Sequence, residues 1–411
     1  MKPNFNRRSA IKLGAAATAG LAMPFYAPNA FAETPIKLGS LLDITGMFGL
    51  DGSRMAQTTR YAVNVLNKQG GLLGRPVQLV SYDTQSSLQL YSQYAEQLVL
   101  KDRVDVVQGG ITSASREAIR PIFDRFKTLY FYNTLYEGGV CDYNVFCTGS
   151  TPSQTVSHVV DYGVKNWGEK CYIIAADYNY GHITTQWVKK YLHDAGAATV
   201  AVDFFPLDAS NFSSAISRIQ QAQPDFLFSA LVPGNQTNFY PQWYAAGMKS
   251  KIPVGTSVFG LGNELVTMNQ TTTEGIVTCF GYFNVLKNPQ NQAFVAGMDA
   301  EFGPINDLSE VDSATYEGIM LWAEAVKKAG SVERVPVIKA LESDISIEGP
   351  SGHVTMSPTL HTTIRTAYLA KVQSGAWDIM NTYPNQIPTD TGDKCNLVSN
   401  PHLATQFTPS F

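Results

Sequence analysis

The sequence contains six histidines, and none of them stands in a pattern typical of catalysis or metal binding. There is no H-E-x-x-H motif, which would place two zinc-binding imidazoles on one helix face. The G-x-S-x-G elbow of serine hydrolases and the phosphate-binding Walker loop are also absent. Gly260-Leu261-Gly262 begins like a dinucleotide fingerprint, but Leu265 stands where the next glycine is required. The sequence therefore predicts a protein that is not an enzyme.

The sequence also contains five cysteines, which could bind a metal or form disulfides: Cys141, Cys147, Cys171, Cys279 and Cys395. No C-x-x-C pair occurs, so a zinc site has no support. Cys141 and Cys147 close the short loop CDYNVFC, and we expect them to form a disulfide in an oxidising compartment. Because the number of cysteines is odd, at least one thiol stays free unless two chains are linked.

The first 32 residues differ from the rest in composition. Four basic residues and no acidic residue precede or adjoin a short apolar run at 13–23, and an A-x-A motif ends at Ala32. This order is typical of an export signal peptide over 1–32 that is cleaved before Glu33. The Arg7-Arg8 pair favours the twin-arginine route, with an ordinary secretory signal as the alternative. Either route predicts a periplasmic protein.

The 411 residues are 44% hydrophobic and carry a net charge of -4, an ordinary composition for a globular protein. No basic run occurs after the signal, so we do not expect a nucleic-acid partner. No later apolar stretch reaches the ~18 residues that span a bilayer, so we do not expect direct membrane insertion. The length predicts two or more folding units.

Short β-branched runs alternate with longer helical patterns along the chain. In the first third we expect strands at 36–42, 76–82, 104–108 and 128–132, separated by helices at 53–68, 88–99 and 114–126. The alternation begins again at 171–175 and continues to a helix that ends near Gly247. Strands separated by such helices indicate parallel sheets, here in two successive α/β lobes. Ligands of such sheets bind beyond the carboxyl ends of the strands, which favours a cleft between the lobes.

Three segments resemble the type I periplasmic solute-binding proteins of the branched-chain amino acid ABC transporter family: IKLGSLLDITGMFGLDG, GGITSASREAIRP and AADYNYG. Four more are similar to the branch of that family that binds urea and short-chain amides: YFYNTLYEGG, TGSTPSQ, FFPLD and LWAEAVKKAGS. The resemblance implies an α/β fold of two Rossmann-like lobes, with a three-strand hinge and a central ligand cleft. Lobe I would contain 33–150 and 281–352, and lobe II would contain 151–280 and 353–411.

The resemblance also implies ligand contacts from two loops of lobe I. In the loop after the third strand, Ser113 is the first candidate and Ser115 the second. Amides at a helix start lack partners, so an acceptor oxygen binds well there, although either serine could serve only as the helix cap. In the loop after the fourth strand, Thr134 would be a polar contact and Tyr132 a wall, unless Tyr132 is a core aromatic. Glu137 is expected to position this loop.

From lobe II the resemblance implies Tyr180, which can act as an apolar lid and as a hydrogen-bond partner. Asn235 and Gln236 would be amide-type contacts from a later loop. Phe259 stands where amino-acid-binding members carry the carboxylate that pairs with the ammonium group of the ligand. Because an unpaired buried ammonium is costly, Phe259 favours a neutral or aromatic-walled ligand. Glu264 lies close by in the sequence and could substitute for that carboxylate.

These features together predict the solute-binding component of an ABC importer. It would capture a small-molecule ligand by lobe closure and deliver it to the permease and ATPase subunits in the inner membrane, with no cofactor. Urea or a short-chain amide is the expected ligand. The alternatives are an amino acid or small organic acid as ligand, or a periplasmic sensor with a regulatory partner. An amide hydrolase would need a nucleophile with an adjacent base, which the sequence lacks.

Overall fold

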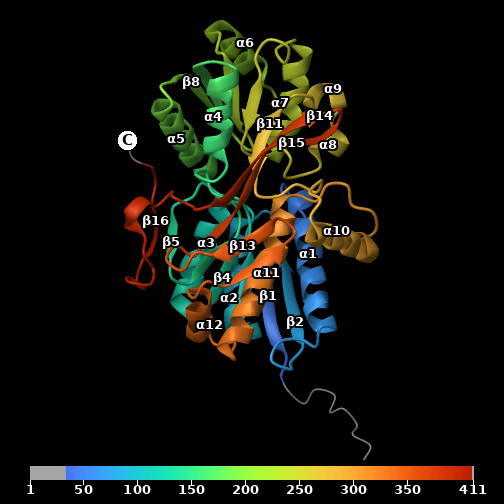
Figure 1. The fold of residues 1–411 in the computed structure, drawn as a ribbon, viewed down its shortest axis with the longest axis vertical. Helices are drawn as coiled ribbons and strands as arrows, with labels where there is room; N and C mark the ends of the chain where they lie inside the picture. The colour runs from blue at the N-terminus through green and yellow to red at the C-terminus, as the bar shows by residue number, and fades with distance from the viewer. Residues whose placement is uncertain (1–33, 410–411) are drawn as a thin grey trace, which may run out of the picture. The chain divides into compact units, whose positions relative to one another are not determined.

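The computed structural model describes residues 34–409, so the signal peptide expected over 1–32 lies outside the described residues. The first sheet is parallel throughout, with the strand order β2-β1-β3-β4-β6. Its strands β1, β2 and β4 are labelled in Figure 1. Its strands are β1 (Ile36–Leu42), β2 (Val77–Asp83), β3 (Val106–Gly109), β4 (Leu129–Tyr132) and β6 (Val145–Cys147). Most of their residues are buried, because helices cover both faces of a parallel sheet.

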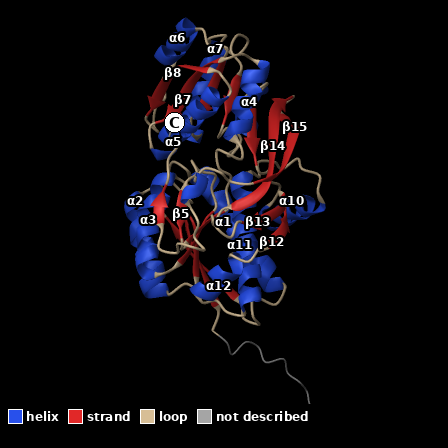
Figure 2. Cartoon of the chain, turned by 60° about the vertical axis from the view of Figure 1, so that its left-hand side comes forward, coloured by secondary structure: helices blue, strands red, loops and turns tan. Residues whose placement is uncertain are grey.

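Helices from distant parts of the chain cover this sheet and form lobe I with it. α1 (Gly49–Lys68) and α11 (Glu310–Ala329) pack on one face, where Leu38 and Trp322 share a core. α2 (Leu88–Gln97) and α3 (Ser113–Phe126) pack on the other face, around Tyr91 and Phe123. Figure 2 shows the strands of lobe I between these two helix layers. The other helices of this lobe are η1 (Leu98–Asp102), α10 (Pro289–Phe302) and α12 (Arg334–Leu341).

A nine-stranded mixed sheet forms lobe II and extends toward lobe I through its edge strands. Its order is β12-β13-β14-β11-β10-β9-β7-β8, with β15 paired to β14. The five strands from β11 to β8 in this order are parallel, and the others are antiparallel. The strands are β7 (Lys170–Ala176), β8 (Ala198–Phe205), β9 (Phe226–Ala230), β10 (Val254–Thr256), β11 (Val277–Phe280), β12 (Ser346–Gly349), β13 (Gly352–Met356), β14 (Thr363–Gln373) and β15 (Ala376–Gln386).

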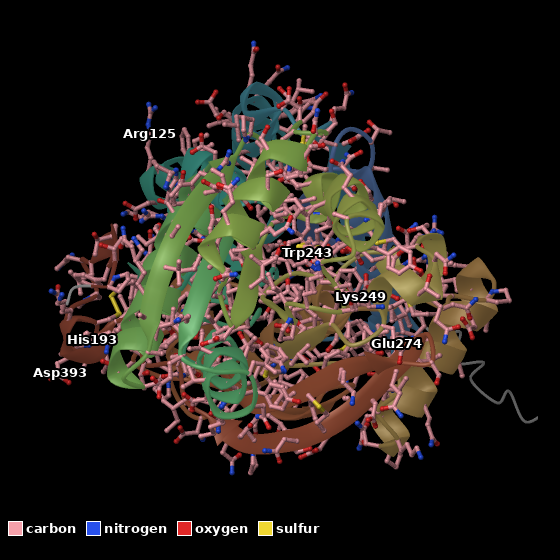
Figure 3. All side chains as sticks on the ribbon, turned by 90° about the horizontal axis from the view of Figure 1, so that it is seen from above. Arg125, His193, Trp243, Lys249, Glu274 and Asp393 are labelled. Carbon is pink, nitrogen blue, oxygen red and sulfur yellow. A yellow bond between two sulfur atoms is a disulfide. The ribbon has the colours of Figure 1, made fainter. Side chains whose placement is uncertain are left out.

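The helices of lobe II flank the parallel part of its sheet. They are α4 (Val156–Asn166), α5 (Asn179–Asp194), α6 (Ser213–Ala222), α7 (Pro233–Ala245), α8 (Glu264–Thr267) and α9 (Gln270–Thr273). Trp243 of α7 is buried in the core of this lobe, whereas His193 of α5 lies exposed at the edge of the molecule (Figure 3). The sequence patterns thus place apolar faces inward on both sides of the sheet.

Buried charges hold together three of the chain segments that pass between the lobes, near Ser150, Gly281 and Arg365. The Arg365 guanidinium on β14 donates to the carbonyl oxygen of Thr148 at 2.6 Å and to Glu317 at 2.7 Å. The Glu310 carboxylate accepts the backbone N–H groups of Ser150 at 2.8 Å and Gly281 at 2.7 Å. The charged side chains of Arg365, Glu310 and Glu317 are fully buried. Such paired and hydrogen-bonded charges fix the geometry of the region that joins the lobes.

The C-terminal end of the chain differs from the expectation that 353–411 belongs to lobe II. Strand β16 (Ala404–Gln406) pairs antiparallel with β5 (Val140–Asp142), which belongs to lobe I. Val354 and Met356 of β13 also pack into the lobe I core. The chain therefore enters lobe II through β14 and β15 and then returns to lobe I, a path that only long-range pairing determines.

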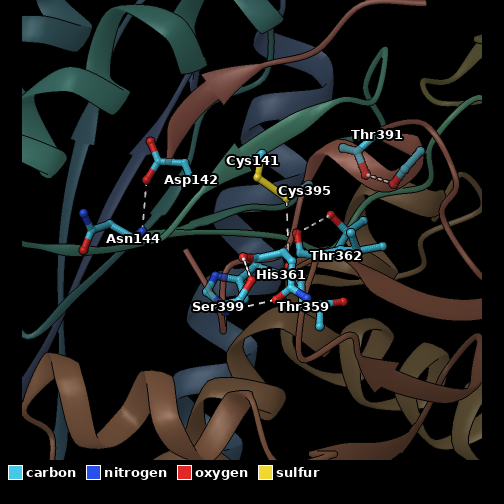
Figure 4. Close-up of a disulfide and its surroundings, with 12 residues drawn as sticks. Cys141, Asp142, Asn144, Thr359, His361, Thr362, Thr391, Cys395 and Ser399 are labelled. Carbon is cyan, nitrogen blue, oxygen red and sulfur yellow. Dashed lines mark hydrogen bonds between the residues drawn. A yellow bond between two sulfur atoms is a disulfide. The ribbon is translucent and has the colours of Figure 1, made fainter. Parts of the chain in front are cut away.

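The disulfide expected between Cys141 and Cys147 is wrong. Cys141 pairs instead with Cys395, with a Cα–Cα distance of 5.8 Å (Figure 4). Cys141 faces a small cluster with Leu397, whereas Cys147 ends β6 inside the lobe I core. Among the described residues, Cys147, Cys171 and Cys279 are buried free thiols. Cys141 and Cys147 are close in sequence, but their side chains lie in two different hydrophobic clusters.

Candidate ligand-binding cavity

A cavity lies where the carboxyl ends of the parallel strands of both sheets meet. It holds about 450 Å³ of space between atoms, part of it open to solvent. Lobe I contributes the segments after β1, β3 and β4 and the start of α11, and lobe II contributes those after β7, β9 and β10. This is the usual ligand position in open α/β sheets. The lining residues are Phe48, Asp51, Ile111, Thr112, Ser113, Tyr132, Thr134, Leu135, Tyr178, Tyr180, Val232, Pro233, Val258, Leu261 and Val311.

Helix α3 begins at the cavity with Ser113 as its first residue. Its N-cap is Thr112, whose hydroxyl oxygen accepts the backbone N–H of Ser115 at 3.0 Å. Neither serine is therefore the cap. Ser113 lines the cavity, whereas Ser115 donates its hydroxyl to the carbonyl oxygen of Thr112 at 2.8 Å and is not part of the lining.

A buried charged network lies behind Ser113. The Ser113 hydroxyl is hydrogen-bonded to Oε2 of Glu137. Oε1 of the same carboxylate accepts from Nη2 of Arg116 at 2.6 Å and from the amide of Gln406 at 2.5 Å. Both Arg116 and Glu137 have fully buried side chains. Glu137 is outside the lining of the cavity and acts on Ser113 instead, while Gln406 connects this network to the C-terminal strand β16.

Tyr132 and Thr134 form the wall that follows β4. The Tyr132 hydroxyl donates to the carbonyl oxygen of Ile111 at 2.8 Å, and the Thr134 hydroxyl donates to that of Gly110 at 3.1 Å. Both bonds join the loop after β4 to the loop after β3. The two lobe I loops of the cavity are therefore fixed against each other.

Tyr180 brings a phenol into the cavity from the start of α5. Its hydroxyl donates to the Ser257 hydroxyl at 2.8 Å. The next residue has to be glycine, because a Cβ on Gly181 would lie 1.9 Å from the carbonyl oxygen of Ala176. This close approach of α5 to the end of β7 determines where Tyr180 stands. Burial raises the pKa of the Tyr180 phenol above its ordinary value, so the group stays neutral.

Asn235, Gln236 and Phe259 were expected in the site, but none of them lines the cavity. The Asn235 amide donates to the carbonyl oxygens of Pro206 and Leu207, at 2.9 and 3.1 Å. The Gln236 amide donates to the carbonyl oxygen of Leu231 at 2.6 Å. Phe259 is 0% exposed within the lobe II core, with ring contacts to Tyr240 and Trp377. All three hold local structure together, because α7 and the loop after β10 turn these side chains inward.

Asp51 is a lining residue that the sequence reasoning missed. It lies in the first turn of α1 and is 7% exposed, and its Oδ1 has no hydrogen-bond partner within residues 34–409. Burial, reinforced by the nearby Glu264 and Asp312, raises the pKa of the Asp51 carboxyl well above its ordinary value. The sequence feature that could have indicated Asp51 is an acidic residue in the first turn of a helix. Such a residue more often lies at the surface, where it interacts favourably with the helix dipole.

Glu264 of α8 lies next to Asp51. A Cβ placed on Gly262 would lie 3.1 Å from Oδ1 of Asp51 and 3.4 Å from Oε1 of Glu264, so both carboxyl groups face the same small gap. Burial raises the pKa of Glu264 to about 7, although the backbone N–H of Gly262 donates to this carboxyl at 3.1 Å. The neighbourhood of the cavity is therefore acidic on this side. Within residues 34–409 the lining contains no lysine, arginine or histidine.

The fold and the cavity together define a two-lobed binding protein, and the sequence comparison gives the family. The family described as periplasmic binding protein matches residues 35–376. The chain belongs to this family. The expected type I periplasmic binding protein fold is confirmed.

Individual relatives are distant in sequence and similar in fold. The Leu/Ile/Val-binding protein homolog 3 of Brucella melitensis biotype 1 is 24% identical over 352 residues, which cover 84% of this chain and 91% of that protein. A solute-binding protein of an ABC transporter from Rhodopseudomonas palustris BisB5, solved with 3,4-dihydroxybenzoic acid, is 22% identical with a TM-score of 0.78 and covers 86% of this chain and 98% of its own. An amino acid ABC transporter substrate-binding protein from Pseudomonas fluorescens Pf-5 is 19% identical with a TM-score of 0.78, covering 89% and 100%.

Neither a membrane-spanning helix nor a metal-binding cluster occurs within residues 34–409. Over residues 34–409, no helix combines the length and apolar character needed to cross a membrane. In the same part of the chain, no group of three or more His, Cys, Asp or Glu side chains is arranged to hold a metal ion.

Proposed function

We propose that this protein captures a small polar solute in the periplasm and delivers it to the permease and ATPase subunits of an ABC importer. The observation that carries the proposal is the cavity whose lining comes from both lobes, at the carboxyl ends of both sets of parallel strands. A ligand that contacts both lobes stabilises the closed arrangement by its differential affinity for it. The signal peptide over 1–32 and the twin-arginine route belong to the same proposal.

A neutral ligand, urea or a short-chain amide, suits the lining best. The lining offers hydroxyl groups and aromatic surface, and within the described chain it has no cationic side chain. A buried carboxylate ligand would lose its hydration without gaining a counter-charge, which is costly. Ser113, Tyr132, Thr134 and Tyr180 are the proposed contacts. The motifs TGSTPSQ and YFYNTLYEGG, which resemble the urea and amide branch, support the same class.

An amino acid is the second candidate ligand, and one observation favours it. The unpartnered Oδ1 of Asp51 in the lining, with Glu264 beside it, could pair with an ammonium group. The name of the Brucella melitensis relative points to the same class of ligand. For such a ligand, Asp51 and Glu264 would supply the negative charge that amino-acid-binding members carry at the position of Phe259.

Thermal unfolding with a panel of solutes tests the proposal. The panel contains urea, formamide, acetamide, propionamide, leucine, glutamate and benzoate, and the protein is the chain without residues 1–32. A ligand at ~100 times its Kd adds about 2.7 kcal/mol to the free energy of unfolding and raises the melting temperature. A shift with urea or an amide supports the neutral-ligand proposal. A shift with leucine alone supports the second candidate, and a shift with benzoate alone contradicts both.

A further inference from the structure

Three of the hydroxyl groups that line the lobe I side of the cavity, those of Ser113, Tyr132 and Thr134, already donate their protons to other protein groups. A hydroxyl has one hydrogen to donate and two lone pairs that accept. The hydroxyls of Tyr132 and Thr134 are paired with the backbone carbonyl oxygens of Ile111 and Gly110, which can only accept. Each of these two hydroxyls must therefore be the donor in its pair. What each one can still offer to a ligand is a lone pair.

Ser113 is in the same position through Glu137. The Glu137 carboxylate lies against the Arg116 guanidinium at 2.6 Å, with both side chains fully buried. Oε1 of this carboxylate accepts from Arg116 and from the Gln406 amide, so the Glu137 side chain serves as the acceptor in this network. The Ser113 hydroxyl, hydrogen-bonded to Oε2 of Glu137, therefore donates to it. Its remaining lone pair is available to the cavity that it lines.

From these three fixed hydroxyls we infer that the cavity selects ligands carrying N–H donors and rejects the carboxylate of the same skeleton. The inference rests on the proposed function and adds to it how the cavity would distinguish an amide from the corresponding acid, and which residue sets that preference. The NH₂ groups of an amide or urea would donate to the hydroxyl oxygens of Ser113, Tyr132 and Thr134. A carboxylate would instead place its lone pairs against those of the wall. Glu137 is then a positioning residue, because it sets the direction of the Ser113 hydroxyl without lining the cavity.

The start of α3 supplies the complementary donors. The first backbone N–H groups of a helix have no partner inside the helix and point along its axis. Ser113 and Ala114 are the first two residues of α3, and Thr112 caps the third amide. A primary amide could thus place its carbonyl oxygen at these N–H groups and its NH₂ group at the hydroxyl oxygens. This donor and acceptor arrangement matches the two ends of an amide group and does not match a carboxylate.

Glu137→Gln tests the inference, because it reverses one hydrogen bond with little change of shape. The carbonyl oxygen of the substituted side chain would keep the contacts with Arg116 and Gln406, and its NH₂ group would replace Oε2 and donate to Ser113. The Ser113 proton would then be free to point into the cavity. Binding is measured by calorimetry for three pairs: acetamide and acetate, propionamide and propionate, benzamide and benzoate. In the wild type, the tightest amide should bind at least about tenfold better than its acid, and in E137Q this ratio should fall by about tenfold.

Glu117→Gln is the matched control. Glu117 also pairs with Arg116, at 2.9 Å, but it neither lines the cavity nor touches Ser113. The substitution removes the same charge from the same guanidinium, and the amide-to-acid ratio should stay within about twofold of the wild type. If E117Q and E137Q change the ratio equally, the effect is general electrostatics and the positioning role of Glu137 is overturned.

Thr134→Val keeps the inference testable if E137Q does not fold. Valine has nearly the shape of threonine and removes a hydroxyl whose proton already goes to Gly110. The amide should bind about fivefold more weakly, while the acid should bind no more weakly than before. Weaker binding of the acid in T134V would show that this hydroxyl donates to ligands, which overturns the inference.

The outcomes separate this inference from the proposed function. If an amide binds and neither E137Q nor T134V changes the amide-to-acid ratio, the inference fails and the proposed function stands. If the wild type prefers an acid, the inference and the amide ligand class fail, while solute capture stands. If no amide of the series binds, the inference fails together with the proposed ligand class.

Discussion

Asp51 brings a carboxyl group into the cavity without a cation to balance it. We predict that Asp51→Asn raises the melting temperature at about pH 8 by roughly 2 °C or more, because the buried carboxyl with its raised pKa no longer has to ionise. Acetamide affinity should change by less than about threefold, since the amide class does not need a counter-charge. Thermal unfolding and calorimetry measure the two effects. A loss of acetamide affinity above about tenfold would contradict this account and place Asp51 among the ligand contacts.

Phe259 is buried in the core of lobe II and does not line the cavity. Phe259→Ala should lower the free energy of unfolding by about 3–5 kcal/mol, as for other buried aromatic side chains. The order of ligand affinities should stay unchanged in the folded variant. Urea unfolding and a repeat of the solute panel check this. Phe259→Leu, which keeps most of the apolar volume, is the milder control, and a changed ligand order in either variant would return Phe259 to the site.

Of the eight residues that the sequence predicted as ligand contacts, four line the cavity: Ser113, Tyr132, Thr134 and Tyr180. These residues lie at or just after the end of a strand, or in the first turn of the following helix, and a strand-helix pattern already places such positions at the carboxyl end of a sheet. Ser115, Asn235, Gln236 and Phe259 do not line the cavity, because the direction of a side chain in a first helical turn or a tight loop depends on packing. Asp51 was missed because nothing local in the sequence shows that it is buried.

Long strands and amphipathic helices were predictable at the scale of elements, and short or late ones were not. Strands β1, β2, β3 and β4 fall close to their expected ranges, because β-branched runs between helical patterns are a strong local signal, whereas the short parallel strand β6 was not expected. Strands β5 and β16 have three residues each and exist through pairing with each other. Strand β15 is mostly exposed and was not expected, since its alternation is weak. Cys395 is the disulfide partner of Cys141 because the C-terminal segment, with β16 paired to β5, lies against lobe I.

The disulfide between Cys141 and Cys395 should fasten the C-terminal segment to lobe I. The two cysteines are 254 residues apart in sequence, so the bond closes a long loop. We predict that Cys395→Ser lowers the free energy of unfolding by about 2–5 kcal/mol. Because Gln406 on β16 donates to Glu137, ligand affinity should also fall modestly in this variant.

Unfolding with and without a reductant provides the control for the disulfide. The reductant should lower the melting temperature of the wild type and leave that of C395S unchanged. An equal response of both proteins would show that another cysteine pair, and not Cys141–Cys395, carries the effect.

The stability of the whole molecule should depend on pH through buried carboxyl groups near the cavity. Burial raises the pKa of Glu264 and of Asp312 to about 7 in the folded protein, above the ordinary values of 4.5 and 3.8. The folded state therefore binds more protons than the unfolded state between these values. For these two groups, the free energy of unfolding is greatest below the ordinary values and falls as the pH rises toward and through about 7.

Chemical unfolding of the wild type and Glu264→Gln at several pH values between about 5 and about 8 checks this prediction. Subtracting the two curves isolates the contribution of Glu264 from that of all other groups. The difference should grow in favour of E264Q as the pH rises. A difference that is independent of pH, or one that grows in favour of the wild type, would contradict the raised pKa.

The central claim is that the cavity between the lobes takes a small neutral solute with N–H donors. Calorimetric titration of the wild-type chain without residues 1–32 with urea, acetamide, leucine and benzoate, under one set of conditions, tests it most directly. We expect saturable binding of urea or acetamide with one ligand per chain, and no binding of benzoate. Binding of benzoate or leucine alone, with neither urea nor acetamide bound, would contradict it.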